Sequence, residues 1–140
     1  MTKLQLAVVT AEGESFSGEV DLIVAPGGAG EFTVLPTYTR LISTLLPGVL
    51  RFDQSGDSVS LALTGGFLEV SQNKVTVLAD AAERDDAIDM ERAEAALARA
   101  EERIASSPAD MDLEKAMASL RRARVRVNLG RRRRDRGLNQ

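Results

Sequence analysis

The sequence contains no cysteine, no histidine and no tryptophan. Without cysteine there is no disulfide framework, no thiolate nucleophile and no zinc site of the usual kind. Without histidine the chain lacks the usual general base near neutral pH and the commonest metal ligand. No catalytic triad or cluster of metal ligands stands out among the remaining residues. We therefore expect no catalytic residue and no metal site in this chain.

Long apolar runs are also missing. No stretch approaches the roughly 20 apolar residues that a membrane-spanning helix needs. The first residues, MTKLQLAVVTAEG, form neither an apolar signal core nor an Arg- and Ser-rich transit sequence. We expect a cytoplasmic protein with no transit or signal peptide. The 140 residues suffice for one domain, or one small domain with an appendage.

Charge is divided unevenly along the chain. Residues 1–87 carry 5 Lys and Arg against 12 Asp and Glu, a net charge of −7. Residues 88–140 carry 13 against 9, a net charge of +4. Most of this excess lies between Arg121 and Arg136, where nine arginines accompany one aspartate. The asymmetry indicates two units with different partners.

The first part of the chain has the pattern of an antiparallel β domain. Short runs of β-forming residues are separated by turn sequences such as AEGE, DQSGD and SQN. Strands of this length recurring about every eight to twelve residues predict an antiparallel sandwich or barrel. The runs cover residues 3–10, 18–26, 48–52, 58–63, 67–70 and 74–79.

Two glycine-rich stretches interrupt this pattern. PGGAGEF (residues 26–32) lacks the Gly-Lys-Ser/Thr ending of a phosphate-binding loop and opens no helix, so it predicts a turn between strands. Gly65 and Gly66 lie inside a strand pattern, LTGGFLEV. Paired glycines there predict a β-bulge or a close approach of two backbones.

From Asp85 onward the apolar period becomes helical. One stripe, mostly alanine, predicts a helix ending near Ser106, and Pro108 forces a break. A second stripe from Leu113 predicts a helix reaching at least Asn128. Joined by SSPAD, the two helices form an antiparallel hairpin. Contacts made mainly by alanine bury little area, so the hairpin is either separable at modest cost or simply docked on the β domain.

The first helix begins in the sequence DDAIDMERAEAA. Asp89 is suited to the N-cap because its carboxylate can accept from free backbone N–H groups of the first turn. Ile88 and Ala93 have the spacing of a hydrophobic staple. Arg92 occupies the third helical position, where a capping box has Glu or Gln, and so places a cation at the positive end of the helix dipole.

Further arginines recur at helical spacing. Arg99 follows Arg92 by seven residues, Arg103 follows Arg99 by four, and Arg122 and Arg126 repeat the spacing of four. Like charges at this spacing are mildly destabilising unless an anion lies near them. Two interpretations remain open: a solvated basic face, or a polyanion site formed when the two helices fold together.

The tail RRRRDRGLNQ admits three interpretations: contact with nucleic acid, a frayed and solvated end, or docking against an acidic protein surface. No aromatic residue follows Tyr38, so this part of the chain has no platform on which bases could stack. We expect no nucleic-acid partner.

Four stretches in order carry a family resemblance: GEFTVLP (30–36), PGVLRF (47–52), GGFLEV (65–70) and VTVLADAAER (75–84), which leads into IDMERA. Together they resemble the epsilon-subunit family of the bacterial F-type ATP synthase, and the likeness covers nearly the whole chain. It implies an antiparallel β-sandwich over residues 1–84 and a regulatory antiparallel two-helix hairpin over residues 85–140.

The resemblance further implies a non-catalytic subunit of the central stalk of a proton-translocating ATP synthase. In that family the sandwich binds the gamma subunit and rests on the c-ring, so membrane contact is indirect and peripheral, at the cytoplasmic face of the bacterial plasma membrane. The folded-down hairpin permits rotation in both directions. The extended hairpin meets the alpha and beta subunits and inhibits ATP hydrolysis. The implied inhibitory residues are Arg121, Arg122, Arg124, Arg126 and Arg131.

Some family members bind ATP as a regulatory ligand in the folded-down form, through a motif Ile/Leu-Asp-x-x-Arg-Ala. Ile88, Asp89, Arg92 and Ala93 match this motif position by position. A free-standing ATP-sensing module, closing on nucleotide without a rotor, is the alternative from a different class. The resemblance implies supporting nucleotide contacts at Glu83, Arg99, Arg122 and Arg126.

The chain departs from the family pattern in one loop. Where the family usually reads GEFGVLPNHAPL, this sequence has Thr33, Thr37, Tyr38 and Arg40 in place of Gly, Asn, His and Pro. The loop is expected near the contact with gamma and the c-ring. A β-branched residue at Thr33 argues against a positive φ there.

Overall fold

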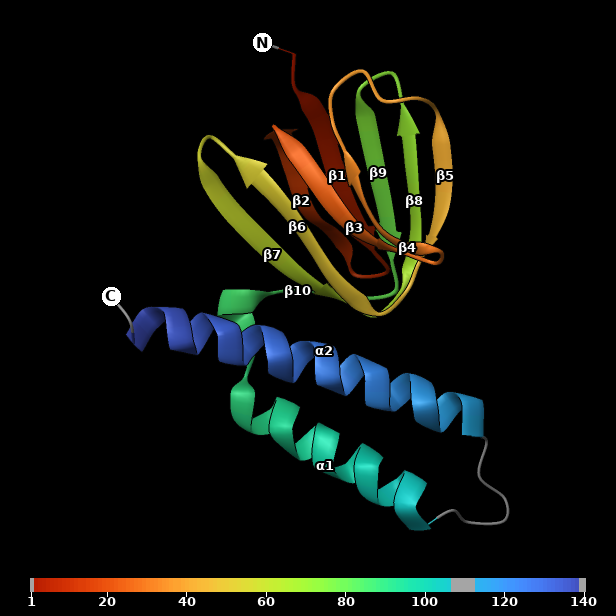
Figure 1. Ribbon diagram of the computed structural model, residues 1–140, viewed down its shortest axis with the longest axis vertical. Coiled ribbons are helices and arrows are strands. Elements are labelled where there is room, and N and C mark those ends of the chain that lie inside the picture. Colours follow the sequence, from red (N-terminus) through yellow and green to blue (C-terminus); the bar gives the residue numbers. More distant parts are fainter. Residues whose placement is uncertain (1, 107–112, 139–140) are drawn as a thin grey trace. The chain divides into compact units, whose positions relative to one another are not determined.

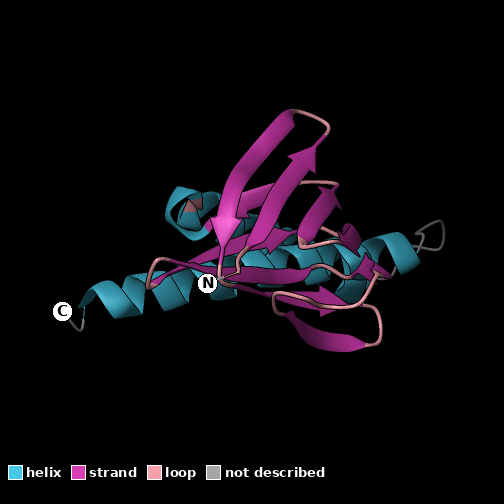
Figure 2. Ribbon diagram, turned by 90° about the horizontal axis from the view of Figure 1, so that it is seen from above, coloured by secondary structure: helices cyan, strands magenta, loops and turns pink. Residues whose placement is uncertain are grey.

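The computed structural model describes residues 2–106 and 113–138, with side chains of the last helix described as far as Arg133 (Figure 1). The chain divides into two compact units, residues 1–84 and 85–140. Figure 2 shows that the first unit is built of strands and the second of helices. The predicted fold class, a β-sandwich followed by a two-helix hairpin, is confirmed.

The first unit contains ten strands, several of which the apolar pattern does not predict. The predicted run over residues 18–26 is two strands interrupted at Asp21, and β4, β5 and β10 were not predicted. The strands are β1 Leu4–Thr10, β2 Gly13–Val20, β3 Leu22–Gly27, β4 Gly30–Val34, β5 Leu41–Leu45, β6 Gly48–Gln54, β7 Asp57–Leu63, β8 Gly66–Ser71, β9 Lys74–Ala79 and β10 Ala82–Arg84.

One hydrogen-bonded sheet joins the strands in the order β10-β7-β6-β3-β5-β8-β9-β1-β2, with β4 paired to β3. All neighbours are antiparallel except β1 and β9, which run parallel with Leu6 opposite Val75. The predicted antiparallel arrangement therefore holds for the described strands apart from this one pair. β1 lies between β9 and β2, so it is an inner strand of the sheet and not an edge strand.

The core of the β unit consists of aliphatic side chains around one aromatic pair. Leu4, Leu6 and Val8 are fully buried, which confirms the alternation expected for the first strand. Phe52 is the largest fully buried side chain, and its ring centroid lies 4.4 Å from that of Phe16. Among the described residues no polar or charged residue is buried, so hydrophobic contact holds this core together.

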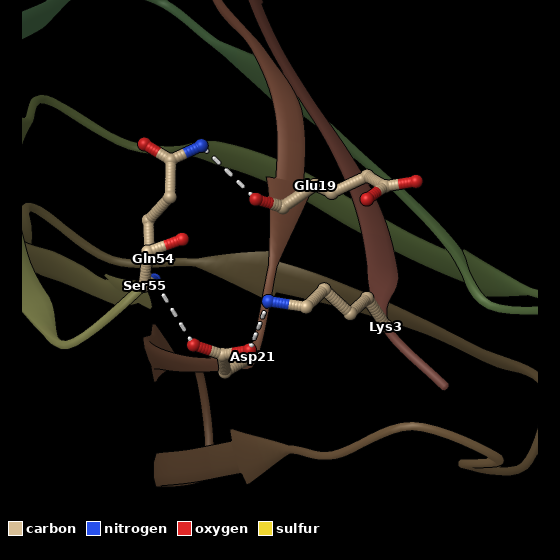
Figure 3. A network of polar contacts seen from close by, with 5 residues as sticks. All are labelled: Lys3, Glu19, Asp21, Gln54 and Ser55. Carbon is tan, nitrogen blue, oxygen red and sulfur yellow. Dashed lines mark hydrogen bonds and ion pairs between the residues drawn. The ribbon is translucent and has the colours of Figure 1, made fainter. Parts of the chain in front are cut away.

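A small polar network ties the first strands to the β6–β7 turn (Figure 3). The Lys3 ammonium lies 2.8 Å from Asp21 Oδ1, and the backbone N–H of Ser55 donates to Asp21 Oδ2 at 3.2 Å. Gln54 donates to the carbonyl oxygen of Glu19 at 3.0 Å. The hydrogen bond from Lys3 holds the pKa of Asp21 below its usual value and raises the pKa of Lys3.

The glycine pair at the start of β8 lies at a close backbone approach, as its position in the strand pattern predicts. Both Gly65 and Gly66 have positive φ angles, 118° and 145°. A Cβ on Gly66 would collide with the carbonyl oxygen of Leu78 and lie 2.9 Å from the Cα of Ala79. Only glycine fits at position 66, because both the space and the backbone angle exclude a side chain.

The loop that departs from the family pattern contains an unusual backbone angle. Thr37 has φ 66°, a conformation uncommon for a β-branched residue, whereas Thr33 lies in the extended strand β4 without a positive φ. The backbone N–H of Thr37 donates to Asn73 Oδ1 at 2.6 Å, which fixes the loop against the β8–β9 turn. The expectation for Thr33 is confirmed.

The second unit consists of a short 3₁₀ turn, η1 (Asp85–Ala87), and two helices, α1 (Met90–Ser106) and α2 (Leu113–Leu138). The first helix is described as far as Ser106, and α2 continues well beyond Asn128. The predicted break at Pro108 lies outside the described residues. Among the described residues, no helix is both long enough and apolar enough to cross a membrane.

Candidate functional site

Asp89 caps α1. The backbone N–H of Arg92 donates to Asp89 Oδ1 at 3.2 Å, and that of Ala93 donates to the Asp89 carbonyl oxygen at 2.9 Å. This confirms the predicted N-cap. Ala93 is fully buried, whereas the Arg92 side chain is exposed. The turn therefore combines a capped backbone with an accessible cation.

The start of α1 packs closely against α2 at Gly130. A Cβ on Gly130 would collide with Met90 Sδ and lie 3.4 Å from Ile88 Cγ2. A glycine inside a helix costs about 1 kcal/mol relative to alanine. Here it leaves room for Ile88 and Met90, and so it brings the distal half of α2 against the first turn of α1.

Nearer the loop, α1 and α2 enclose a groove of about 320 Å³, which we call the hairpin groove. Three alanines leave this space open, and none of the described residues that line it is acidic. Within the described residues, neither the Arg99 nor the Arg103 guanidinium is in an ion pair. The groove is lined by Ala96, Arg99, Ala100, Arg103, Ala116 and Ser119.

A third arginine reaches the edge of the hairpin groove. One guanidinium nitrogen of Arg122, a half-buried residue of α2, donates to Ser119 Oγ at 3.0 Å. Because Ser119 lines the groove, this bond places the Arg122 guanidinium next to one wall of the groove, whose other polar residues are Arg99 and Arg103. Such a concentration of guanidinium groups is suited to binding a phosphate chain.

The basic end of α2 makes ion pairs within the hairpin. Arg133 lies 3.3 Å from Asp85 Oδ1, and Arg131 lies 3.8 Å from Glu94 Oε1. The Asp85 side chain is only 11% exposed, while both arginines are about half exposed. At least as far as Arg133, therefore, this segment is helical and paired with acidic residues of η1 and α1, not a frayed end.

The β unit carries an exposed apolar surface on β5, β8 and β9, made by Ile42, Phe67 and Leu78, which we call the apolar face. Ile42 is 75% exposed, Phe67 55% and Leu78 54%. Phe67 and Leu78 are direct cross-strand partners, and a hollow of about 180 Å³ lies among these three residues. Glu69 and Thr76 also line this hollow. A group of exposed apolar side chains of this kind marks a binding surface more often than single exposed residues do.

Both units match families of known proteins. The ATP synthase delta/epsilon chain β-sandwich domain matches residues 3–85, and the ATP synthase delta/epsilon chain long alpha-helix domain matches residues 86–129. The chain belongs to the ATP synthase delta/epsilon-chain family. The expected family is therefore confirmed over nearly the whole sequence, and the arginines at 131–136 lie beyond the matched part.

Individual relatives agree with this assignment. The ATP synthase epsilon chain of Desulforamulus reducens is 44% identical over 91% of this chain and 97% of its own length. The epsilon chain of Pelotomaculum thermopropionicum is 52% identical over 72% of this chain and 75% of its own. A chain of the mitochondrial ATP synthase OSCP/F1/c-ring structure from Euglena gracilis, 22% identical, shares the fold with a TM-score of 0.76 over 86% of this chain and 77% of its own.

The residues that the family resemblance implies for nucleotide binding occupy three places. Ile88, Asp89, Arg92 and Ala93 lie at the start of α1. Arg99 lines the hairpin groove and Arg122 reaches its edge, while Arg126 is half-buried further along α2. Glu83 belongs to the other unit, on β10 opposite Ala62 of β7. Of the implied inhibitory residues, Arg121, Arg124 and Arg131 are exposed on α2.

Two polar residues of the groove, Arg103 and Ser119, are absent from the set that the resemblance implies. Arg103 follows Arg99 by four residues, so helical spacing alone predicts that the two arginines lie on the same face of the helix. Ser119 has no comparable signal, because a serine in a helix is usually an exposed polar residue. Among the described residues, no group of three Asp or Glu side chains is arranged to hold a metal ion.

Proposed function

We propose that this chain is a stalk subunit of an F-type ATP synthase that links the gamma subunit to the c-ring and restrains ATP hydrolysis. The match of both units to the delta/epsilon-chain family carries this proposal. The neighbouring solved structure is itself an F1/c-ring assembly. In this role the chain would lie at the cytoplasmic face of the bacterial plasma membrane, in indirect contact with the membrane through the c-ring.

We propose the apolar face as the surface that binds gamma. Its three large side chains gain free energy when a partner covers them, at about 25 cal/mol for each Å² removed from water. Pairing between the strands fixes the positions of these side chains: Phe67 lies opposite Leu78, and Ile42 lies opposite Glu69. A preformed surface of this kind loses little conformational entropy on binding.

The hairpin is proposed as the regulatory element. Much of the hairpin interior consists of small residues, among them the buried Ala93, Ala116 and Ala123. Because alanines bury little apolar area, α1 and α2 separate at a modest cost in free energy. The ion pairs of Arg131 and Arg133 are partly exposed and add little to the closed form. An opened α2 would offer its basic residues to acidic segments of the alpha and beta subunits and so inhibit hydrolysis.

Adding this protein to the matching catalytic complex, purified without its epsilon subunit, is expected to lower the rate of ATP hydrolysis. Arg124→Ala, which removes an exposed cation of α2, is expected to relieve part of this inhibition while leaving association with gamma unchanged. The measurements are the steady-state hydrolysis rate and co-elution with gamma. If the chain elutes alone and leaves the rate unaltered, it is no stalk subunit, and ATP binding by that chain would favour a free-standing sensor.

We propose that the closed hairpin binds ATP as a regulatory ligand. The accessible Arg92 at the capped start of α1 supports this, as do the guanidinium groups of the hairpin groove, which form no ion pair with any described residue. A bound polyphosphate would neutralise the like charges of Arg99 and Arg103. It would also supply negative charge near the positive end of the helix dipole, where Arg92 stands in place of an acid.

Arg92→Ala is expected to weaken ATP binding by about tenfold or more, because a hydrogen bond to a charged group contributes about 1.5–3 kcal/mol. Titration calorimetry on the intact protein measures this. Arg132→Ala is the matched control, since Arg132 is an exposed arginine of α2 outside the implied site. Equal affinities for the wild type and Arg92→Ala would remove Arg92 from the site.

A further inference from the structure

We infer that the distal part of α2 is a clasp that fastens the closed hairpin to the start of α1, and that Gly130 is the residue that allows it to dock. The distal clasp comprises residues 127–133 of α2. From Gly130 onward it lies beyond the part of the chain that the family model matches. The inference rests on the proposed regulatory role of the hairpin, and it specifies the contact that sets the balance between the closed and open forms.

The buried stripe of α2 continues into the distal clasp. Ala116, Leu120, Ala123 and Val127 are all buried, and they follow one another at helical spacings of four, three and four residues. Gly130 is the next position of this series, three residues after Val127, and it is buried as well. The packed face of α2 therefore reaches Gly130, although the last turns of the helix consist mainly of arginine.

Gly130 forms a notch for the start of α1, which lies beside the distal half of α2 (Figure 1). A Cβ at this position would collide with Met90 Sδ and lie 3.4 Å from both Met90 Cγ and Ile88 Cγ2. The backbone of Gly130 is helical and has no positive φ, so its conformation does not require glycine. Glycine weakens a helix interior, and here the close contact with Met90 and Ile88 is what requires it.

Two ion pairs accompany this contact. Arg133 lies three residues after Gly130, on the same face of α2, and its guanidinium is 3.3 Å from Asp85 Oδ1. Arg131 lies 3.8 Å from Glu94 Oε1. Pairs whose arginines are half exposed contribute little to stability. They agree, however, with one rotation of α2 about its axis, the rotation in which Gly130 faces the start of α1.

The distal clasp matters for opening because the rest of the hairpin packs through small residues. Buried alanines such as Ala93 and Ala123 contribute little apolar area each. Ile88 and Met90 are larger apolar side chains, and both contact α2 at the Gly130 notch. A side chain in the notch would push the two helices apart at the end of the hairpin away from Ser106 and would shift it toward the open form.

Gly130→Leu is expected to raise the open-to-closed ratio of the hairpin by about tenfold or more, because it overpacks a close contact. The ratio is measured on the full chain carrying Ala123→Cys, whose thiol is unique because the sequence has no cysteine. Ala123 is 5% exposed, so this thiol reacts with dithionitrobenzoate only when the hairpin opens. The labelling rate, divided by the rate for the unfolded chain, gives the open fraction.

The direction of the change separates the clasp from an effect of helix propensity. Leucine favours a helix more than glycine does, so without the contact Gly130→Leu would stabilise α2 and would not speed the labelling. Asn128→Leu is the matched control, since Asn128 is an exposed residue of α2 outside the notch. We expect its labelling rate to stay at or below that of the wild type. Circular dichroism verifies that α2 has formed, and a rate for Gly130→Leu no higher than that of the wild type overturns the inference.

A double-mutant cycle with Met90 tests the contact itself. Gly130→Ala is expected to speed the labelling by about threefold or more, because the Met90 side chain must leave its place. In a Met90→Ala background the new Cβ meets no sulfur, so Gly130→Ala should cause no further acceleration. Equal acceleration in both backgrounds contradicts the role of the contact between Gly130 and Met90.

Failure of the clasp and failure of the proposed regulatory role give different results. Added to the catalytic complex purified without its epsilon subunit, Gly130→Leu should inhibit ATP hydrolysis more strongly than the wild type, because the open form is the proposed inhibitory form. If neither protein alters the hydrolysis rate while Gly130→Leu still speeds the labelling, the clasp stands and the regulatory role is wrong. If the wild type inhibits and Gly130→Leu is labelled no faster, the regulatory role stands and the clasp is wrong.

Discussion

Gly66→Ala is expected to destabilise the β unit by about 2–6 kcal/mol, the sum of overpacking and backbone strain that each cost about 1–3 kcal/mol. The new Cβ would collide with the carbonyl oxygen of Leu78, which belongs to the paired strand β9 and cannot rotate away. The residue would also have to hold a φ of 145°. Urea unfolding followed by circular dichroism, together with hydrogen exchange of the β8 and β9 amides, measures the loss.

Gly30→Ala separates the two causes. Gly30 has a similar φ of 130°, but a Cβ there would meet no atom within 4 Å. Only backbone strain applies, so we expect a loss of about 1–2 kcal/mol. If Gly30→Ala and Gly66→Ala unfold at the same urea concentration, the contact with the backbone of β9 contributes nothing and the explanation given for Gly66 is wrong.

Leu78→Asp is expected to weaken association with the gamma subunit by about 100-fold or more. A carboxylate on the apolar face would be buried by the partner without a compensating charge, which costs several kcal/mol. The substitution is tolerable in the free protein because Leu78 is 54% exposed. Surface plasmon resonance with immobilised gamma subunit measures the affinity, and thermal unfolding verifies the fold.

Leu113→Asp provides the matched control for this surface. Leu113 is 59% exposed, and its replacement by Asp is the same chemical change as Leu78→Asp. Leu113, however, lies at the start of α2 and not on the sheet. We expect its affinity for gamma to stay within about twofold of the wild type, as is usual for residues outside an interface core. Equal losses at both positions would show that the effect is one of general surface charge, and the apolar face would then not be the gamma surface.

Local sequence signals account for much of the hairpin. A carboxylate at Asp89 satisfies the first-turn N–H groups from within the same few residues, so the cap could be predicted without any tertiary contact. The helix over Met90–Ser106 likewise follows from an apolar period of about 3.6 residues. The extension of α2 to Leu138 could not be predicted in this way, because its last turns contain few apolar residues and a glycine.

The β unit was only partly predictable. Strands with buried alternating residues, such as β1 and β9, leave a pattern in the sequence. β2 does not, because its residues are mostly polar and exposed, and it owes its conformation to pairing with β1 along its length. The parallel pair β1 and β9 joins segments about 70 residues apart, and periodicity contains no information about which strands become neighbours.

By itself, the sequence determined the two units, the cap of the first helix, the close approach at Gly66 and the excess of arginines at helical spacing. These depend on chemistry within a few residues. Only the tertiary structure decided that Arg103 and Ser119 share a groove and that Ile42, Phe67 and Leu78 form one exposed face. The physical reason is that such surfaces are assembled across helices and strands, whose pairing is set by packing of the whole unit and not by local propensity.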